Sequence, residues 1–131
     1  MLDRIILGFP VVLLLAAPAS AMDCPTSDLA YEAREQAVKD APTCKAALDV
    51  MEACAFGATG DRGLATIVQQ RCEPLFLPKL SKAQRRAYDR EQGHCDEKYA
   101  RKSGTMYRSA SAFCQAQSTV NYAARFGGKP K

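Results

Sequence analysis

Apolar side chains recur at every third or fourth position along much of this 131-residue chain. This spacing places them on one face of an α-helix. The clearest stretch, residues 80–125, contains two such patterns separated by Gly104. Ser81 and Gln84 have the spacing of a capping box at the start of the first pattern, and Thr105 opens the second. We therefore expect two antiparallel helices that fold back at Gly104.

The preceding part of the chain begins with two further helical patterns. Residues 29–41 follow the cap-forming residues 26–28 and should end before Pro42, because proline interrupts a helix. Residues 44–56 follow Thr43, which is a second candidate cap. Both segments are rich in residues that favour helices, so we expect two short helices joined at Pro42.

A third pattern starts after a glycine-rich turn at 57–63, with Asp61 as its expected cap. Pro74 lacks a backbone N–H, so we expect this helix to kink or end near Cys72. Residues 73–80 contain two prolines, Pro74 and Pro78, and are expected to be irregular.

The helical spacing also predicts which side chains are buried. On the four helices after the first, these are Cys44, Ala47, Leu48, Met51, Cys54 and Ala55; Leu64, Ile67, Val68, Cys72 and Leu75; Ala87, Tyr88, Glu91 or Gln92, Cys95 and Tyr99; and Met106, Ala110, Phe113, Cys114, Gln117, Val120 and Ala124. No alternating pattern of β-branched residues competes with these helices. We predict an all-α fold, a small disulfide-stapled bundle of about five helices in which hairpins 43–73 and 81–125 are variations on one unit.

The first 21 residues have the pattern of a secretory signal peptide. Arg4 precedes an apolar run, 5–17, that is too short for a membrane-spanning helix, and 19–21 form an A-x-A cleavage site. Retention of this segment as an N-terminal anchor is the alternative. We expect cleavage near Ala21, a single helical domain over 22–125, a disordered tail over 126–131, and a soluble periplasmic or secreted protein.

All six cysteines lie after the expected cleavage point, and an even number in a short exported chain is typical of a disulfide framework. The alternative is a set of reduced, buried thiols in a cytosolic protein. Cys44 and Cys54 cannot pair within one helix, because ten residues separate them by about 15 Å. In an antiparallel hairpin, residues at similar distances on either side of the bend lie level with each other. This geometry predicts that Cys44 pairs with Cys72 and Cys95 with Cys114, which leaves Cys24 for Cys54. Each bridge could contribute about 3 kcal/mol.

Charge is distributed unevenly along the chain. Residues 22–61 contain eight acidic and three basic residues, a net charge of −5, whereas residues 62–131 contain five acidic and fourteen basic residues, a net charge of +9. Solvated helix faces explain such patterns in many proteins, but opposite charges also suit a charged partner. The acidic face that could bind a partner comprises Asp28, Glu32, Glu35, Asp40, Asp49 and Glu52.

Candidate catalytic or ligand-binding motifs are weak. His94 is the only histidine, and the neighbouring Cys95 would point about 100° away on a helix, which argues against a nucleophilic triad and a conventional zinc site. Acidic pairs such as Asp89 and Glu91 indicate surface charge balance, and the 57–63 glycines give only a weak phosphate-loop signal. We predict no catalytic residues, metal or cofactor, no enzyme activity, and no binding to nucleic acid.

The C-terminal stretch resembles the LprI-type lysozyme inhibitor domain, a family of small exported helical proteins. The residues that match are Leu80, Gln84-Arg85, Cys95, Gly104-Thr105, Cys114 and Ala123 to Arg125. The sequence departs from the family pattern at Ala87, which stands in a tryptophan position beside Tyr88. The resemblance covers about the last third to half of the mature chain. It implies a helical fold and inhibition of c-type lysozyme.

We therefore expect an exported periplasmic protein that binds a protein partner, with c-type lysozyme as the first candidate. Lysozymes of this type are cationic, so the acidic first half would steer the encounter. A periplasmic helical chaperone or envelope interaction module, without inhibitory activity, is the alternative.

Overall fold

The computed structural model describes residues 22–128, which contain five α-helices and one 3₁₀ helix but no strand. The elements are α1 (Tyr31–Asp40), α2 (Cys44–Cys54), α3 (Asp61–Phe76), η1 (Leu77–Lys79), α4 (Lys82–Tyr99) and α5 (Thr105–Phe126). The predicted signal peptide and residues 129–131 of the predicted tail lie outside this range. The all-α fold class is confirmed.

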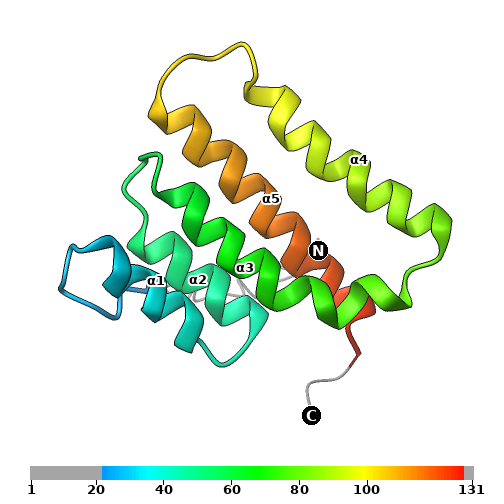
Figure 1. Ribbon diagram of the computed structural model, residues 1–131, viewed down its shortest axis with the longest axis horizontal. Coiled ribbons are helices and arrows are strands. Elements are labelled where there is room, and N and C mark those ends of the chain that lie inside the picture. The colour runs from blue at the N-terminus through cyan, green and yellow to red at the C-terminus, as the bar shows by residue number, and fades with distance from the viewer. Residues whose placement is uncertain (1–21, 129–131) are drawn as a thin grey trace, which may run out of the picture.

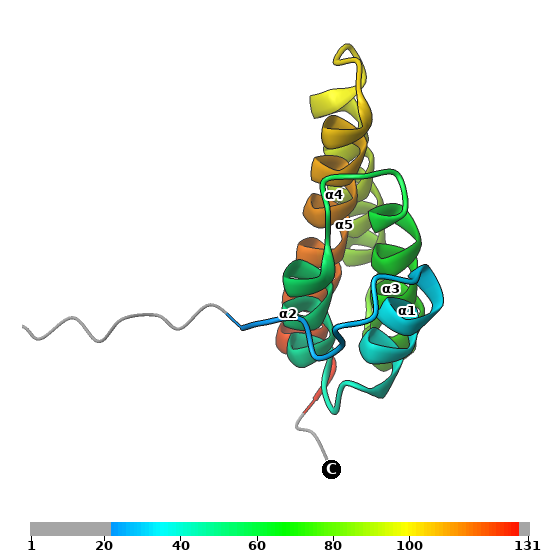
Figure 2. The same cartoon turned by 90° about the vertical axis from the view of Figure 1, so that its left-hand side faces the viewer.

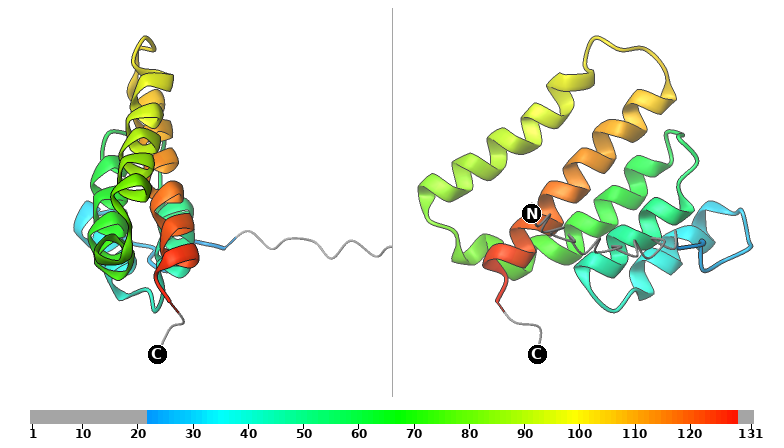
Figure 3. Two further views of the ribbon diagram at one scale, coloured as in Figure 1. Left: turned by 90° about the vertical axis from the view of Figure 1, so that its right-hand side faces the viewer. Right: turned by 180° about the vertical axis from the view of Figure 1, so that it is seen from behind.

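Helix α5 lies between α4 on one side and α3 on the other, and α1 and α2 flank α3 at the opposite edge (Figure 1). Helices α4 and α5 form one antiparallel hairpin, and α2 and α3 form another. The tip of the α4–α5 hairpin extends beyond the turn that joins α2 to α3 (Figure 2). The view from behind shows the same order of helices across the molecule (Figure 3). Helix α4 is therefore an edge helix, and its neighbour is α5.

The apolar core is centred on α3, where α1, α2 and α5 meet it. Its largest fully buried apolar side chains are Phe76, Leu48, Met51, Leu64, Val38 and Val68. Burial of each such side chain contributes about 1.5 to 3 kcal/mol. The predicted faces of α2 and α3 supply most of these residues, so the periodicity in this part of the sequence identifies the core correctly.

Local signals at the helix starts are also confirmed. The Ser81 hydroxyl accepts the Gln84 backbone N–H at 3.2 Å, and the Gln84 side chain accepts the Ser81 N–H at 2.8 Å. The Thr43 hydroxyl accepts the Ala46 N–H at 3.0 Å at the start of α2. Gly104 has a φ of 114°, which side chains with a Cβ rarely adopt, so a glycine suits the bend of the α4–α5 hairpin.

Of the two outcomes predicted at Pro74, a kink or an end near Cys72, the end is wrong. Helix α3 continues through Pro74 to Phe76, and much of the stretch expected to be irregular is helical. The extra turn places Phe76 fully inside the core and leaves Leu75, which was expected to be buried, 48% exposed. Burial of the Phe76 ring against Tyr88 and Tyr122 offsets the backbone hydrogen bond that Pro74 cannot donate.

The predicted buried stripe of α5 is wrong at several positions, because Met106, Gln117 and Ala124 are exposed. The buried residues of this helix are mostly small and often polar: Ser109, Ser111, Ala112, Ala116, Ser118, Thr119, Val120 and Ala123. Helix α5 packs against neighbours on two sides, so a single apolar stripe does not describe it. Met106 is exposed because it lies at the hairpin tip, beyond the core.

Smaller corrections concern α1, α2 and α4. Helix α1 begins at Tyr31, two residues later than expected, and the Asp28 carboxylate accepts the Ala30 N–H at 2.8 Å just before it. Helix α2 ends at Cys54 rather than at residue 56. On α4, Glu91 is exposed and Gln92 is the residue that turns inward.

The glycines at the start of α3 provide space for Tyr31 of α1. A Cβ atom built on Gly63 would lie 1.7 Å from the Tyr31 hydroxyl oxygen, and one on Gly60 would touch the ring at 3.4 Å. The spacing of these glycines therefore reflects helix packing in this structure.

Candidate binding surfaces

Three disulfides connect the helices, and they are the pairs that the hairpin geometry predicts. Cys24 bonds to Cys54, Cys44 to Cys72, and Cys95 to Cys114, with Cα–Cα distances of 4.8, 5.7 and 5.6 Å. None of the six cysteines, all of which lie in the described range, is free. The disulfides fit an oxidising compartment such as the periplasm or the extracellular space.

The six acidic residues predicted as a partner-binding face lie on α1, on α2 or just before α1, at one edge of the molecule (Figure 1). Part of their charge is balanced locally. Glu35 pairs with Lys39 at 3.5 Å, and Asp49 pairs with Lys45. Glu32 and Glu52 are exposed and take part in none of the ion pairs found in residues 22–128. Asp28 and Asp40 are also exposed and outside these ion pairs, but each accepts a hydrogen bond, from the Ala30 N–H and from the Gln36 side chain. Glu32 and Glu52 are therefore the most available acidic groups at this edge.

Asp61 differs from the other acidic residues of the first half because it is fully buried. Its carboxylate accepts the backbone N–H groups of Phe56 and Ala58 at 3.2 and 3.0 Å, and the Ser109 hydroxyl at 2.6 Å. Asp61 thus holds the α2–α3 turn closed and joins it to α5. The prediction that Asp61 caps α3 is wrong, because the N-cap is Gly60 and Asp61 is the first residue of the helix. Its carboxylate binds the preceding turn, and its bond to Ser109 depends on tertiary packing.

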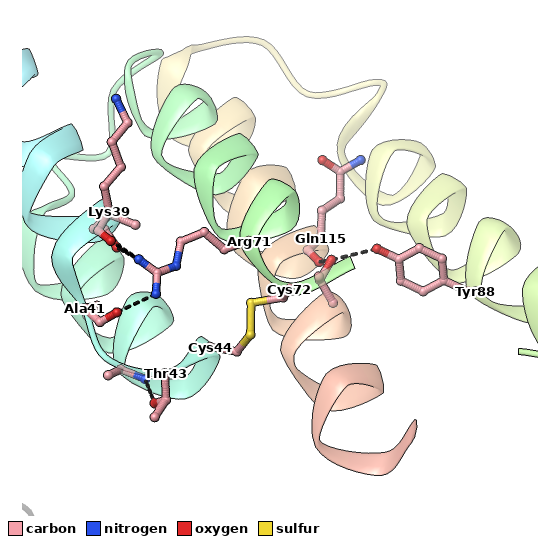
Figure 4. The surroundings of a disulfide bond; sticks show 11 residues. Lys39, Ala41, Thr43, Cys44, Arg71, Cys72, Tyr88 and Gln115 are labelled. Atoms are coloured by element: carbon pink, nitrogen blue, oxygen red, sulfur yellow. Dashed lines mark hydrogen bonds between the residues drawn. A yellow bond between two sulfur atoms is a disulfide. The ribbon is translucent and has the colours of Figure 1, made fainter. Parts of the chain in front are cut away.

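Two arginines bind backbone carbonyl groups at helix ends that lack a partner within the helix. The Arg34 guanidinium donates to the Cys54 carbonyl at the end of α2 at 3.2 Å, and lies 4.4 Å from the centre of the Phe56 ring. Arg71 of α3 donates to the carbonyls of Lys39 and Ala41 at the end of α1, beside the Cys44–Cys72 disulfide (Figure 4). A positive charge at a helix C-terminus is favourable. Both arginines therefore have structural roles.

A hydrogen-bonded polar seam joins α3, α4 and α5. The Tyr88 hydroxyl donates to Glu73 of α3 at 2.8 Å and lies 2.8 Å from the Thr119 hydroxyl of α5. Gln92 donates to the Gln115 carbonyl at 3.2 Å. Burial raises the pKa of the Tyr88 hydroxyl well above its usual value, and the Glu73 carboxylate acts in the same direction. The seam fixes how α4 sits on the rest of the molecule.

We expect Tyr88→Phe to lower the free energy of unfolding by about 1 to 2 kcal/mol at pH 7, because Glu73 and Thr119 lose a buried partner. The raised pKa favours neutral Tyr88 in the folded state, so its contribution to stability is complete below about pH 10 and is lost as the pH rises above that value. Denaturant unfolding of the two proteins at pH 7 and pH 11 measures both effects. Tyr107→Phe, at the hairpin tip, is the control and should change neither. If the wild type and Tyr88→Phe lose equal stability between pH 7 and pH 11, ionisation of Tyr88 is not the cause of the alkaline loss.

A groove of about 850 Å³ lies between the end of α5, the end of α3 and the α1–α2 connection. Leu75, Val120, Ala123 and Ala124 give it an apolar lining, and Lys45 and Lys79 also line it. The groove borders the Cys44–Cys72 disulfide. Its composition suits an apolar segment of a polypeptide more than a small polar ligand.

A second cavity, the tip pocket, lies where the α4–α5 hairpin passes the start of α3. It has a volume of about 230 Å³. Its lining residues are Arg62, Asp96, Tyr99, Ala100, Lys102, Tyr107, Arg108 and Ser111. Sequence analysis did not identify this pocket, because its residues come from three separate segments.

Comparisons with known proteins give no match. Neither the protein-family models, nor the curated proteins, nor the solved structures contain one for this chain. The resemblance of the C-terminal hairpin to LprI-type inhibitors therefore stays a prediction.

The remaining candidate chemical groups are exposed residues of a single helix. His94 is exposed on α4, as are Asp89 and Glu91. Across residues 22–128, no group of three or more histidine, cysteine or acidic side chains is placed to hold a metal ion. No helix in that part of the chain is both long and apolar enough to cross a membrane.

Proposed function

We propose that the chain is an exported, non-enzymatic binding protein, and that its α1–α2 edge receives a cationic protein partner. The observation on which this depends is the exposed pair Glu32 and Glu52, on two helices held together by disulfides. Cys24–Cys54 ties the segment before α1 to the end of α2, and Cys44–Cys72 ties α2 to α3. A surface made rigid in this way loses little conformational entropy when it binds.

A c-type lysozyme is the partner we propose, with inhibition of peptidoglycan hydrolysis as the consequence. The cationic surface of such a lysozyme complements the acidic edge, and the resemblance of the 80–125 hairpin to LprI-type inhibitors supports this choice. The proposal includes removal of residues 1–21 on export to the periplasm or the medium, supported by the signal-peptide pattern of that segment and by the disulfides.

The test is a turbidity assay of peptidoglycan digestion by a c-type lysozyme, with the disulfide-bonded protein added at increasing ratios. We expect slower digestion at an equimolar ratio, and weaker inhibition at high salt. Glu32→Gln/Glu52→Gln should raise the concentration needed for half-inhibition about tenfold, because each lost charge weakens a steered encounter.

Glu91→Gln/Glu97→Gln is the matched control, because it removes two exposed carboxylates from α4 and makes the same change in net charge. It should leave inhibition unchanged. Unchanged digestion at every ratio would reject lysozyme as the partner, and equal losses in the two double variants would reject the α1–α2 edge as the binding surface.

A periplasmic chaperone or envelope interaction module is the second candidate, supported by the apolar groove beside Leu75. Lys79, which belongs to none of the ion pairs in the described range, would suit an apolar segment flanked by an acidic residue. This function would be favoured over inhibition if the protein suppresses aggregation of an unfolded client and leaves lysozyme activity unchanged. Leu75→Ser should then lose the suppression.

A further inference from the structure

We propose that the tip pocket binds a phosphorylated sugar, either free or as the head group of a lipid. This ligand differs from the protein partner proposed above and uses basic residues instead of the acidic residues of α1 and α2. The pocket volume of about 230 Å³ lies below the roughly 300 to 1,000 Å³ of typical ligand pockets, so a single ring with its charged group is the size that suits it.

Positive charge converges on this pocket from three segments. Arg62 comes from the first turn of α3, Lys102 from the α4–α5 connection, and Arg108 from the first turn of α5. All three side chains are exposed, and none belongs to the ion pairs seen in the described range. Guanidinium groups bind phosphate through paired hydrogen bonds, and an ammonium group adds a point charge.

The start of α5 adds to this positive potential. Its N-cap is Gly104, which has no side chain to accept the first N–H groups, and its first turn contains no acidic residue. The start of α3 differs, because Asp61 lies in its first turn. The partial positive charge of the α5 N-terminus therefore acts beside Arg108 without a compensating carboxylate in the same turn.

Two tyrosines and one carboxylate favour a sugar over a bare anion. The rings of Tyr99 and Tyr107 lie 6.4 Å apart between centres at an angle of 31°, and Lys102 lies over the Tyr107 ring at 5.7 Å. Half-buried tyrosine rings offer a flat surface to the C–H face of a sugar. Asp96 accepts the Ser111 hydroxyl at 2.8 Å through one oxygen, and carboxylate oxygens also accept sugar hydroxyl groups.

The test is a calorimetric titration of the full chain, expressed in a bacterial host and purified with its disulfides formed. The probes for calorimetry are glucose 6-phosphate, inorganic phosphate and glucose. A separate sedimentation assay measures binding to phosphatidylcholine vesicles with and without lipid A, which displays a phosphorylated glucosamine. We expect glucose 6-phosphate to bind at least tenfold more tightly than inorganic phosphate or glucose. Binding of glucose 6-phosphate alone identifies a free ligand, whereas binding only to lipid A vesicles identifies a membrane source.

Variants distinguish recognition by the tip pocket from attraction to the net positive charge of the protein. Arg62→Gln/Arg108→Gln should weaken binding of the phosphorylated sugar at least tenfold, whereas Arg86→Gln/Arg90→Gln, which removes two exposed arginines from α4, should leave it unchanged. Tyr107→Ala should weaken binding of the sugar phosphate but not of inorganic phosphate. Tyr107→Phe, which keeps the aromatic ring, should bind the sugar phosphate as the wild type does. Circular dichroism checks the fold of each variant.

Two results would overturn the proposal. One is the absence of binding to both glucose 6-phosphate and lipid A vesicles by the wild-type protein. The other is an equal loss of binding in the two double-arginine variants, because this would show attraction to net charge instead of recognition by the pocket. Neither result depends on lysozyme inhibition, so the two proposals can fail separately.

Discussion

Asp61→Ala is expected to lower the free energy of unfolding by about 3 to 4 kcal/mol. The substitution leaves the Ser109 hydroxyl without its acceptor at a buried position, and the part-buried N–H groups of Phe56 and Ala58 also lose theirs. A buried donor without a partner costs about 1 to 3 kcal/mol, and water entering the opened turn would recover part of the total. Urea unfolding followed by circular dichroism measures the difference.

Two controls make this experiment specific. Asp61→Asn keeps one acceptor oxygen and should cost about half as much as the alanine variant, and Glu52→Ala removes an exposed carboxylate and should cost less than about 0.5 kcal/mol. Similar losses in Asp61→Ala and Glu52→Ala would contradict the structural role of the Asp61 carboxylate.

Cys44→Ala/Cys72→Ala should lower the free energy of unfolding by about 3 to 5 kcal/mol. The bridge closes a loop with a sequence separation of 28 residues, and Cys72 of α3 is fully buried in the core. Loss of loop closure contributes about 3.5 kcal/mol in the chain-entropy estimate, and the small cavity left at Cys72 adds to it. Thermal or denaturant unfolding of the double variant provides the value.

Cys95→Ala/Cys114→Ala serves as the comparison. Its sequence separation is 19, so the same estimate gives a similar loss of loop-closure entropy. Helix α4 is an edge helix, however, so we expect hydrogen exchange in this variant to rise first at the hairpin tip, whereas the Cys44–Cys72 variant should lose protection in α2 and α3. Identical exchange patterns in the two variants would show that the bridges do not stabilise separate hairpins.

The sequence predicts two of the cysteine pairs because a hairpin is locally symmetric, and the third pair, Cys24–Cys54, follows because no other cysteines remain. Residues at equal distances from a bend such as Gly104 come level with each other, whatever the rest of the fold does. The capping box at Ser81 and the cap at Thr43 are predictable because each depends only on residues within one turn of a helix.

The errors arise where tertiary packing decides the structure. Pro74 was expected to kink or end a helix near Cys72, but burial of Phe76 favours continuation of the helix to that residue. The buried face of α5 escaped notice because Ser109 and Thr119 are polar, and they are buried because each has a hydrogen-bond partner on another helix. Periodicity of apolar residues does not reveal such positions.

The binding surfaces were accessible to sequence reasoning to different extents. The acidic residues of α1 and α2 follow from the charge distribution, although local ion pairs reduce how many of them are available. The tip pocket could not be predicted, because it requires Arg62 of α3 to lie beside Tyr107 of α5, and no local pattern connects these segments. The same limit applies to the groove that contains Leu75 and Val120.

Three specific disulfides hold together the two helical hairpins and the segment before α1. Digestion of the unreduced protein followed by mass spectrometry tests this arrangement. We expect peptides linked through Cys24–Cys54, Cys44–Cys72 and Cys95–Cys114, and no thiol that reacts with an alkylating agent before reduction. Any other pairing, or a free thiol in the folded protein, would contradict this arrangement.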